Sequence, residues 1–307
     1  MSSPNGSSVY PESRNPPMAD PLAPGARSRW TLVASGLAFP EAPRWHDGAL
    51  WFSDIFDGLV KRVGAAGEVT VVAAVPTGPS GLGWRPDGTL LIASMADRRL
   101  LSFDGTATRF GADLSTIARG PVNDMVVTPS GFAYVGNFGY DYEGGAPRAA
   151  ARLALVDLDG SVREVADDLW FPNGMAVTPD GATLLVAETG ASRVTSFAIG
   201  SDGALGIRRT WADLGTAGPD GISLDAEGAL WIASPRTREI LRVAEGGRVL
   251  DAIGAPGGMG QACALGGDDG RTLFVCSSPT HDRAEARRDH SGSIWSLPVD
   301  VPAATLQ

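Results

Sequence analysis

The chain has 307 residues, and its 43 % hydrophobic content is enough for a sizeable core. Glycine (40) and proline (22) make up about one residue in five, against a usual share of about 12 %, which argues against a helical bundle and for short elements joined by turns. The formal net charge of −10 excludes the basic surface of a nucleic-acid-binding protein.

The scarce residues exclude several mechanisms. There is no HExxH pair, no GxSxG elbow and no GxxxxGK[ST] loop. The cysteines Cys263 and Cys276 form no CxxC motif, which disfavours a zinc site or a disulfide framework. Lys61 is the single lysine, so it is the one candidate for Schiff-base chemistry. The sequence therefore favours a mechanism without a serine, cysteine or lysine nucleophile.

Residues 1–28 are rich in Ser, Pro and Gly and poor in β-branched residues, which predicts a disordered leader with order beginning near Trp30. This segment has neither a basic n-region nor an apolar h-region, so it does not look like a secretory signal. No apolar run reaches the roughly 18 residues of a membrane span. We expect a cytoplasmic protein with no membrane partner.

The rest of the chain repeats one pattern of a polar start, a short apolar strand, a turn that ends in glycine, and a second apolar strand. The six turn glycines recur at intervals of 40–50 residues and are Gly48, Gly88, Gly131, Gly181, Gly228 and Gly270. Most repeats add two further strands. This period predicts an all-β fold, a six-bladed β-propeller with four-stranded antiparallel blades.

The ends of the chain predict how the ring closes. The sixth repeat ends with its third strand, GSIWSLPVDV, so the segment from Trp30 to Leu37 is free to supply the fourth. Such a strand leaves no sheet edge exposed. Residues 29–307 are thus expected to form one domain.

Polar residues stand at the start of four inner strands, where a propeller converges on its central channel. They are Glu41, Asn123, Asn173 and Asp220. Each alone is an ordinary turn or surface residue, and together they either line a wet channel or form a functional site. Carboxylate and amide oxygens without sulfur or imidazole suit Ca²⁺, Mg²⁺ or Mn²⁺. Crowded carboxylates also need a positive partner.

Loops on the same face of the ring are expected to set specificity. The longest repeat contains the segment from Asn137 to Ala151, in which Tyr140 or Tyr142 could cover a pocket. Arg236 follows a second strand on this face and is a candidate for anion contact. The charged segment 279–291 is expected to be a solvated loop.

Several blocks of the sequence resemble one known family. They include PEAPRW, PVNDMVV with GNFGYD, FPNGMAVTPDG, PDGISLDAEGALWIASP and CALGGDDGRTLFV, and they extend from about Leu37 to Val299. The chain resembles the SMP-30/gluconolactonase/LRE-like (regucalcin-type) family of six-bladed propellers. That resemblance implies a divalent cation in the channel, with Ca²⁺ expected first and Zn²⁺, Mg²⁺ or Mn²⁺ as alternatives.

The resemblance also implies roles for individual residues. Glu41, Asn173 and Asp220 match the metal ligands, Asp220 matches the proposed catalytic base, and Asn123 matches a substrate-contacting asparagine. We add Asn137, Tyr140 and Arg236 as substrate-binding residues on the same face. One position departs from the family, because Pro121 stands where some relatives carry an arginine that contacts sugar-lactone hydroxyls.

These observations predict a metal-dependent hydrolase that opens a lactone or another small ester with water, an EC 3.1.1 activity. One alternative is a non-hydrolytic binding or scaffold propeller stabilised by a metal. Another keeps the metal but changes the reaction to a different ester or phosphotriester hydrolysis, or to an isomerisation, because a fold does not select among these.

Overall fold

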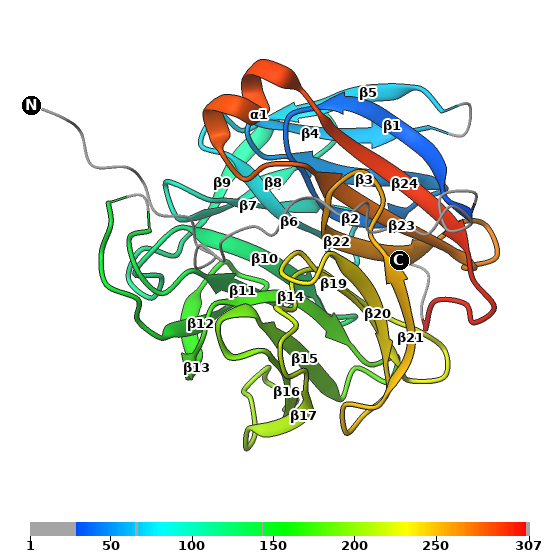
Figure 1. Ribbon diagram of the computed structural model, residues 1–307. Helices are drawn as coiled ribbons and strands as arrows, with labels where there is room; N and C mark the ends of the chain where they lie inside the picture. Colours follow the sequence, from blue (N-terminus) through cyan, green and yellow to red (C-terminus); the bar gives the residue numbers. More distant parts are fainter. Residues whose placement is uncertain (1–28, 65–66, 143, 305–307) are drawn as a thin grey trace, which may run out of the picture.

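The computed structural model describes residues 29–64, 67–142 and 144–304. These residues form six four-stranded antiparallel sheets arranged around a ring (Figure 1). The predicted six-bladed β-propeller is therefore confirmed. The leader predicted over residues 1–28 lies outside the described residues.

Blades one to five each use four strands that are consecutive in the chain, ordered from the channel outward. Blade one contains β2 (Pro40–His46), β3 (Ala49–Asp54), β4 (Leu59–Val63) and β5 (Val69–Ala74). Blade two contains β6 (Pro79–Trp84), β7 (Leu90–Ser94), β8 (Arg99–Phe103) and β9 (Thr108–Asp113). Blade three contains β10 (Val122–Val127), β11 (Ala133–Asn137), β12 (Ala151–Val156) and β13 (Val162–Leu169).

The remaining blades follow the same plan. Blade four contains β14 (Pro172–Val177), β15 (Thr183–Glu188), β16 (Arg193–Ala198) and β17 (Arg209–Asp213), with the short 3₁₀ helix η2 (Thr189–Ala191) after β15. Blade five contains β18 (Ile222–Leu224), β19 (Leu230–Ser234), β20 (Glu239–Val243) and β21 (Val249–Gly254). Blade six contains β22 (Met259–Gly266), β23 (Thr272–Ser278), β24 (Gly292–Pro298) and β1 (Thr31–Leu37).

The two ends of the chain meet in blade six. Strand β1 pairs antiparallel with β24, from Thr31 opposite Ser296 to Leu37 opposite Gly292, and the two strands lie side by side in Figure 1. The predicted closure by the N-terminal strand is confirmed. As a result β24 is paired on both sides, and the first and last strands of the ring are held in one sheet.

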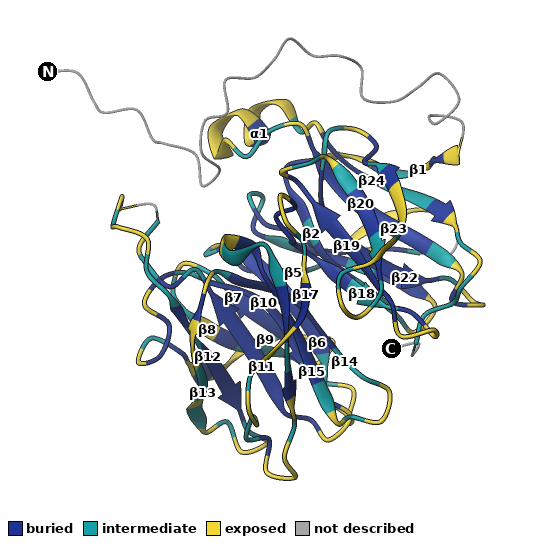
Figure 2. Cartoon of the chain, turned by 60° about the horizontal axis from the view of Figure 1, so that its bottom comes forward, coloured by how far each residue is buried: buried dark blue, intermediate teal, exposed yellow. Residues whose placement is uncertain are grey.

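The core consists of six apolar clusters, each between two neighbouring blades. The inner strands are mostly buried, while the outermost strands and the turns are largely exposed (Figure 2). Trp231 belongs to the cluster between blades five and six, while Trp51 and Trp84 pack against the cluster between blades one and two. These three tryptophans therefore serve packing between blades. Cys263 and Cys276 are free, buried thiols on adjacent strands.

The segment 279–291 differs from the predicted loop, because it contains the helix α1 (Arg283–Asp289). The side chain of Asp282 caps the helix by accepting a hydrogen bond from the backbone N–H of Glu285, and Arg288 lies in the last turn, where a cation is favourable. Only Ala286 of this helix is buried, so its charged side chains are solvated as predicted. Among the described residues, neither this helix nor any other has the length and apolar character needed to cross a membrane.

Candidate metal and substrate site

The inner strands change register where the candidate residues stand. Pairing of β2 with β3 shifts between Glu41 and Arg44, and pairing of β10 with β11 shifts between Val122 and Met125. Pairing of β14 with β15 shifts between Pro172 and Met175. A β-bulge bends a strand and re-aims a side chain. The bulges therefore interrupt the regular ladder at the positions of Glu41, Asn123 and Asn173.

A close approach of two inner strands brings Asn173 beside Asp220. Gly174, the residue after Asn173, makes the contact: its N–H donates to the carbonyl oxygen of Asp220 over 3.1 Å. A Cβ on Gly174 would lie 2.4 Å from that same oxygen, which is inside any normal contact. Glycine is thus required for the two backbones to touch, and the contact lets Asn173 hydrogen-bond the Asp220 carboxylate.

Glu41, Asn173 and Asp220 lie close together in the structure, and Asn123 precedes Asp124, whose charge acts on both carboxyls. Asn123, Asn173 and Asp220 are 8 %, 5 % and 6 % exposed, respectively, and Glu41 keeps partial exposure to the channel. The carboxylates of Glu41 and Asp220 lie close enough to repel each other. The inner-strand starts of blades one, four and five thus place Glu41, Asn173 and Asp220 near one another. Their roles as ligands, base and substrate contact stay predictions.

Burial and mutual repulsion both disfavour ionisation of these carboxyls. Desolvation, followed by the charge of Asp124, raises the pKa of Glu41 from 4.5 to about 8. Desolvation, followed by the charges of Glu41 and Asp124, raises the pKa of Asp220 well above its usual range. A site of this kind holds protons at neutral pH unless a positive charge replaces them.

Asp124 is a third buried carboxylate, and the sequence analysis missed it. Burial raises its pKa, but Arg44 opposes that shift by donating from Nη2 to Oδ1 over 2.7 Å. The same Nη2 also donates to the carbonyl oxygen of Met125. Arg44 comes from blade one and Asp124 from blade three, so the ion pair crosses the inner strand of blade two. The tandem Asn-Asp of PVNDMVV was the available signal for this residue.

Polar residues near the beginnings of other inner strands hold the channel residues by hydrogen bonds. Ser80 donates from Oγ to Oδ1 of Asn123 over 3.3 Å, and Asn173 donates from Nδ2 to Oγ1 of Thr189 over 3.2 Å. Gln261 is fully buried. Its amide donates to the carbonyl oxygen of Pro40 and accepts from the N–H of Ser278, which ties blade six to blade one.

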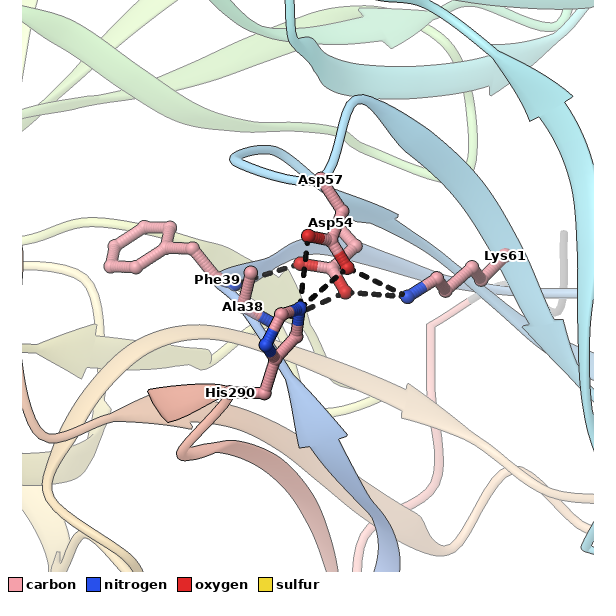
Figure 3. A network of polar contacts seen from close by, with 6 residues as sticks. All are labelled: Ala38, Phe39, Asp54, Asp57, Lys61 and His290. Carbon is pink, nitrogen blue, oxygen red and sulfur yellow. Dashed lines mark hydrogen bonds and ion pairs between the residues drawn. The ribbon is translucent and has the colours of Figure 1, made fainter. Parts of the chain in front are cut away.

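A second polar network fixes the backbone just before Glu41 (Figure 3). Asp54 is fully buried and accepts from the N–H of Ala38 and of Phe39 over 3.3 and 2.7 Å. Lys61 donates to the same carboxylate over 2.7 Å. Lys61 also reaches Asp57, which in turn contacts His290 at the end of α1. The network thus joins the link between β1 and β2 to blade one and to α1.

The donor set fits a divalent cation. Within the described part of the chain, no three or more His, Cys, Asp and Glu side chains form a metal cluster, so a site here has to combine carboxylates with amide oxygens. Glu41, Asn173 and Asp220 supply such hard oxygen donors. Two charges from a cation and one from Arg44 would offset the three buried carboxylates, which relieves the repulsion that raises their pKa values.

A cavity of about 120 Å³ opens beside this cluster. Tyr140 and Arg236, both predicted to bind substrate, line it together with Thr189. Asn137 lies at the end of β11 with its amide engaged, since Nδ2 donates to the carbonyl oxygen of Arg152 and Oδ1 accepts from the N–H of Gly139. In this structure Asn137 shapes the loop that carries Tyr140, and its contact with substrate stays a prediction.

A match to a known protein family identifies the chain's relatives. Residues 39–279 match the model of the SMP-30/Gluconolactonase/LRE-like region. The chain belongs to this family. The matched range contains all four channel residues, and it confirms the family inferred from the sequence blocks.

Characterised relatives of this SMP-30/gluconolactonase chain include sugar lactonases. A 6-deoxy-6-sulfogluconolactonase of Pseudomonas putida is 27 % identical over 85 % of this chain and 91 % of its own length. A pentonolactonase of Haloferax volcanii is 27 % identical over 87 % and 93 %. Among solved structures, regucalcin of Agrobacterium tumefaciens, a calcium-binding protein, has a TM-score of 0.76 and 25 % identity, covering 89 % of this chain and 94 % of its own.

Proposed function

We propose that the chain is a lactonase, a carboxylic-ester hydrolase that opens a small lactone in the central channel with the help of one divalent cation. Family membership and the lactonase relatives support the reaction class. The observation that carries the metal requirement is the cluster of buried carboxylates, with the pKa of Glu41 raised to about 8. These relatives favour an enzyme over a binding or scaffold propeller.

Glu41, Asn173 and Asp220 would hold the cation, with Ca²⁺ as the first expectation and Zn²⁺, Mg²⁺ or Mn²⁺ as alternatives. The chemistry that a divalent cation supplies when bound is polarisation of the ester carbonyl and a charge that keeps these carboxylates ionised. Asn123 hydrogen-bonds the lactone and orients it. Its Oδ1 is already held by Ser80, so the amide N–H₂ is the donor left for substrate.

Asp220 acts as the general base. It takes a proton from water as the water oxygen bonds to the carbonyl carbon, and the ring C–O bond then breaks. The proton passes to the departing ring oxygen, so the products are a carboxylic acid and an alcohol on one molecule. Asp124, held in place by Arg44, provides a negative charge that strengthens the basicity of Asp220.

Acid release from sugar, aliphatic and aromatic lactones tests the proposal, with chelated protein reconstituted with each of the four cations. We expect activity only after a cation is added, and an at least hundredfold loss in Asp220→Asn. Asp87→Asn is the matched control, because Asp87 is an exposed turn carboxylate bonded to the N–H of Thr89. Full activity of the chelated protein or of Asp220→Asn would refute the mechanism.

A further inference from the structure

The cavity beside the channel differs in chemistry from the channel itself. It is lined by four aromatic residues, two arginines and three small residues, namely Phe138, Tyr140, Trp170, Phe171, Arg148, Arg236, Ala149, Thr189 and Gly190. Among the described residues no carboxylate lines it. The cavity thus presents arginine and aromatic side chains, while the neighbouring channel presents carboxylates. The carboxylates suit the proposed cation, and the cavity suits a different chemical group.

Arg236 is held by neutral acceptors. Its Nη1 donates to Oγ of Ser192 over 2.8 Å and its Nη2 donates to the carbonyl oxygen of Thr189 over 3.3 Å. A guanidinium has five N–H donors, so these contacts fix the group and leave donors for a ligand. Arg236 is exposed and forms no ion pair with a carboxylate among the described residues, so its charge is not offset by a partner at the cavity.

The walls of the cavity are preorganised. Phe171 has a φ of 55°, which is an outlier for a bulky residue and costs of order 1 kcal/mol. Its ring meets that of Phe138 edge to face, with 4.5 Å between ring centroids. The N–H of Phe138 donates to the carbonyl oxygen of Pro121, just before the strand that carries Asn123. Aromatic walls lower the local dielectric and so strengthen a contact between a guanidinium and an anion.

The cavity is one side chain away from the reacting centre. Thr189 lines it and accepts a hydrogen bond from Asn173 while donating to the carbonyl oxygen of Pro219, the residue before Asp220. A volume of about 120 Å³ corresponds to about four molecules of liquid water. This space fits a compact substituent on the lactone ring.

We propose that this cavity is a subsite for an anionic substituent, so that the substrate is a lactone bearing a carboxylate, sulfonate or phosphate group near its ring. Arg236 and Arg148 bind the anion through charge-assisted hydrogen bonds. In the channel three carboxylates offset the charge of the proposed cation and of Arg44, whereas among the described residues no carboxylate lines the cavity. The inference rests on the proposed lactonase function, since it names the substrate of that same site.

A matched pair of substrates tests it on the Ca²⁺-loaded full chain. γ-Butyrolactone-γ-carboxylate and the neutral γ-carboxamide differ only in charge. We expect a higher kcat/KM for the carboxylate. Arg236→Gln should lower that value roughly tenfold or more, the usual cost of losing a hydrogen bond to a charged group, and should lower the value for the carboxamide by a clearly smaller factor. Arg248→Gln is the control, because Arg248 is exposed and outside the cavity.

A binding measurement keeps the two proposals separable. Pyroglutamate and pyroglutamide are lactams with the same shapes as the lactone pair and are not lactone substrates. Calorimetry should find pyroglutamate bound more tightly, with that preference lost in Arg236→Gln. If this preference appears while no lactone is hydrolysed, the subsite stands and the proposed function fails. Equal binding of the two lactams, binding of neither, or a preference that Arg236→Gln leaves intact would overturn the subsite.

Discussion

The substitution Glu41→Gln should remove a pH dependence that the channel imposes on stability. Burial raises the pKa of Glu41 from 4.5 to about 8 in the folded, metal-free protein. Below pH 4.5 both folded and unfolded states carry the proton. Between these pKa values the unfolded chain releases the proton and the folded chain keeps it, so the free energy of unfolding falls as pH rises. Glutamine has no proton to lose and removes this dependence.

The size of the effect follows from the pKa shift. Each pH unit inside the window lowers the free energy of unfolding by about 1.4 kcal/mol. From pH 5 to pH 7.5 the Glu41 carboxyl therefore contributes a loss of about 3 kcal/mol. We expect Glu41→Gln to gain up to about that amount relative to the wild type over the same range; the contribution of Asp220 also changes in this variant, because Glu41 acts on the pKa of Asp220.

Urea unfolding of chelated protein, followed by tryptophan fluorescence at several pH values, measures this difference. Glu245→Gln is the control, because Glu245 is exposed. Adding Ca²⁺ should offset most of this difference at pH 7.5, since a ligand at a hundred times its Kd stabilises the wild type by about 2.7 kcal/mol. A difference between Glu41→Gln and wild type that does not change with pH would refute the electrostatic reasoning.

Three further predictions concern the same region. Gly174→Ala should lower the free energy of unfolding by at least about 2 kcal/mol and weaken Ca²⁺ binding, because the added Cβ would lie 2.4 Å from the carbonyl oxygen of Asp220. A urea unfolding curve identical to that of the wild type would contradict this. Lys61→Met leaves Asp54 buried without its 2.7 Å ion pair, so thermal unfolding should show a free energy of unfolding lower by about 3–5 kcal/mol; a loss below about 1 kcal/mol would contradict this. Ca²⁺ should bind more tightly at pH 8 than at pH 6 and release protons, because Glu41 and Asp220 have raised pKa values. Calorimetry in buffers of different ionisation enthalpy measures the number of protons released, and a number of zero would contradict the prediction.

The blades could be predicted from the sequence because each is a local unit. Strands that pair within a blade are close in the chain, and the turn between them needs a left-handed residue that glycine provides. Gly48 and Gly228 have φ values of 71° and 77°, as the repeated pattern requires. Closure by β1 was equally predictable, since five repeats had four strands and one had three. Nothing about these features depended on a side-chain contact.

The site was only partly predictable, because its geometry depends on bulges and on contacts between distant blades. Counting residues back from each turn glycine located Glu41 and Asp220 at one radial position. Asp124 was missed because a regular strand turns neighbouring side chains to opposite faces, and the bulge after Val122 breaks that alternation. The partner of Asp124 is Arg44, which is 80 residues away in the sequence, and no local pattern predicts such a pair.

Helix α1 was missed for a different reason. Its 7 residues are too few to show a helical hydrophobic period, and only Ala286 is buried. The local signal was Asp282 three residues before Glu285, an N-cap followed by good helix formers. That signal predicts a helix start but not that the segment has enough tertiary support to stay folded. The contact between His290 and Asp57 supplies such support from blade one.

The arrangement of the channel residues couples the proposed chemistry to the closure of the ring. Glu41 follows β1 by four residues in the chain, and Asp54 holds the intervening backbone at Ala38 and Phe39. Asn173 and Asp220 come from blades four and five, so a cation bound by all three would link opposite sides of the ring. Such a ligand stabilises the closed ring by mass action. Without a cation, desolvation of these carboxylates raises their pKa values. The same desolvation strengthens their interaction with a bound cation and makes Asp220 a more effective base.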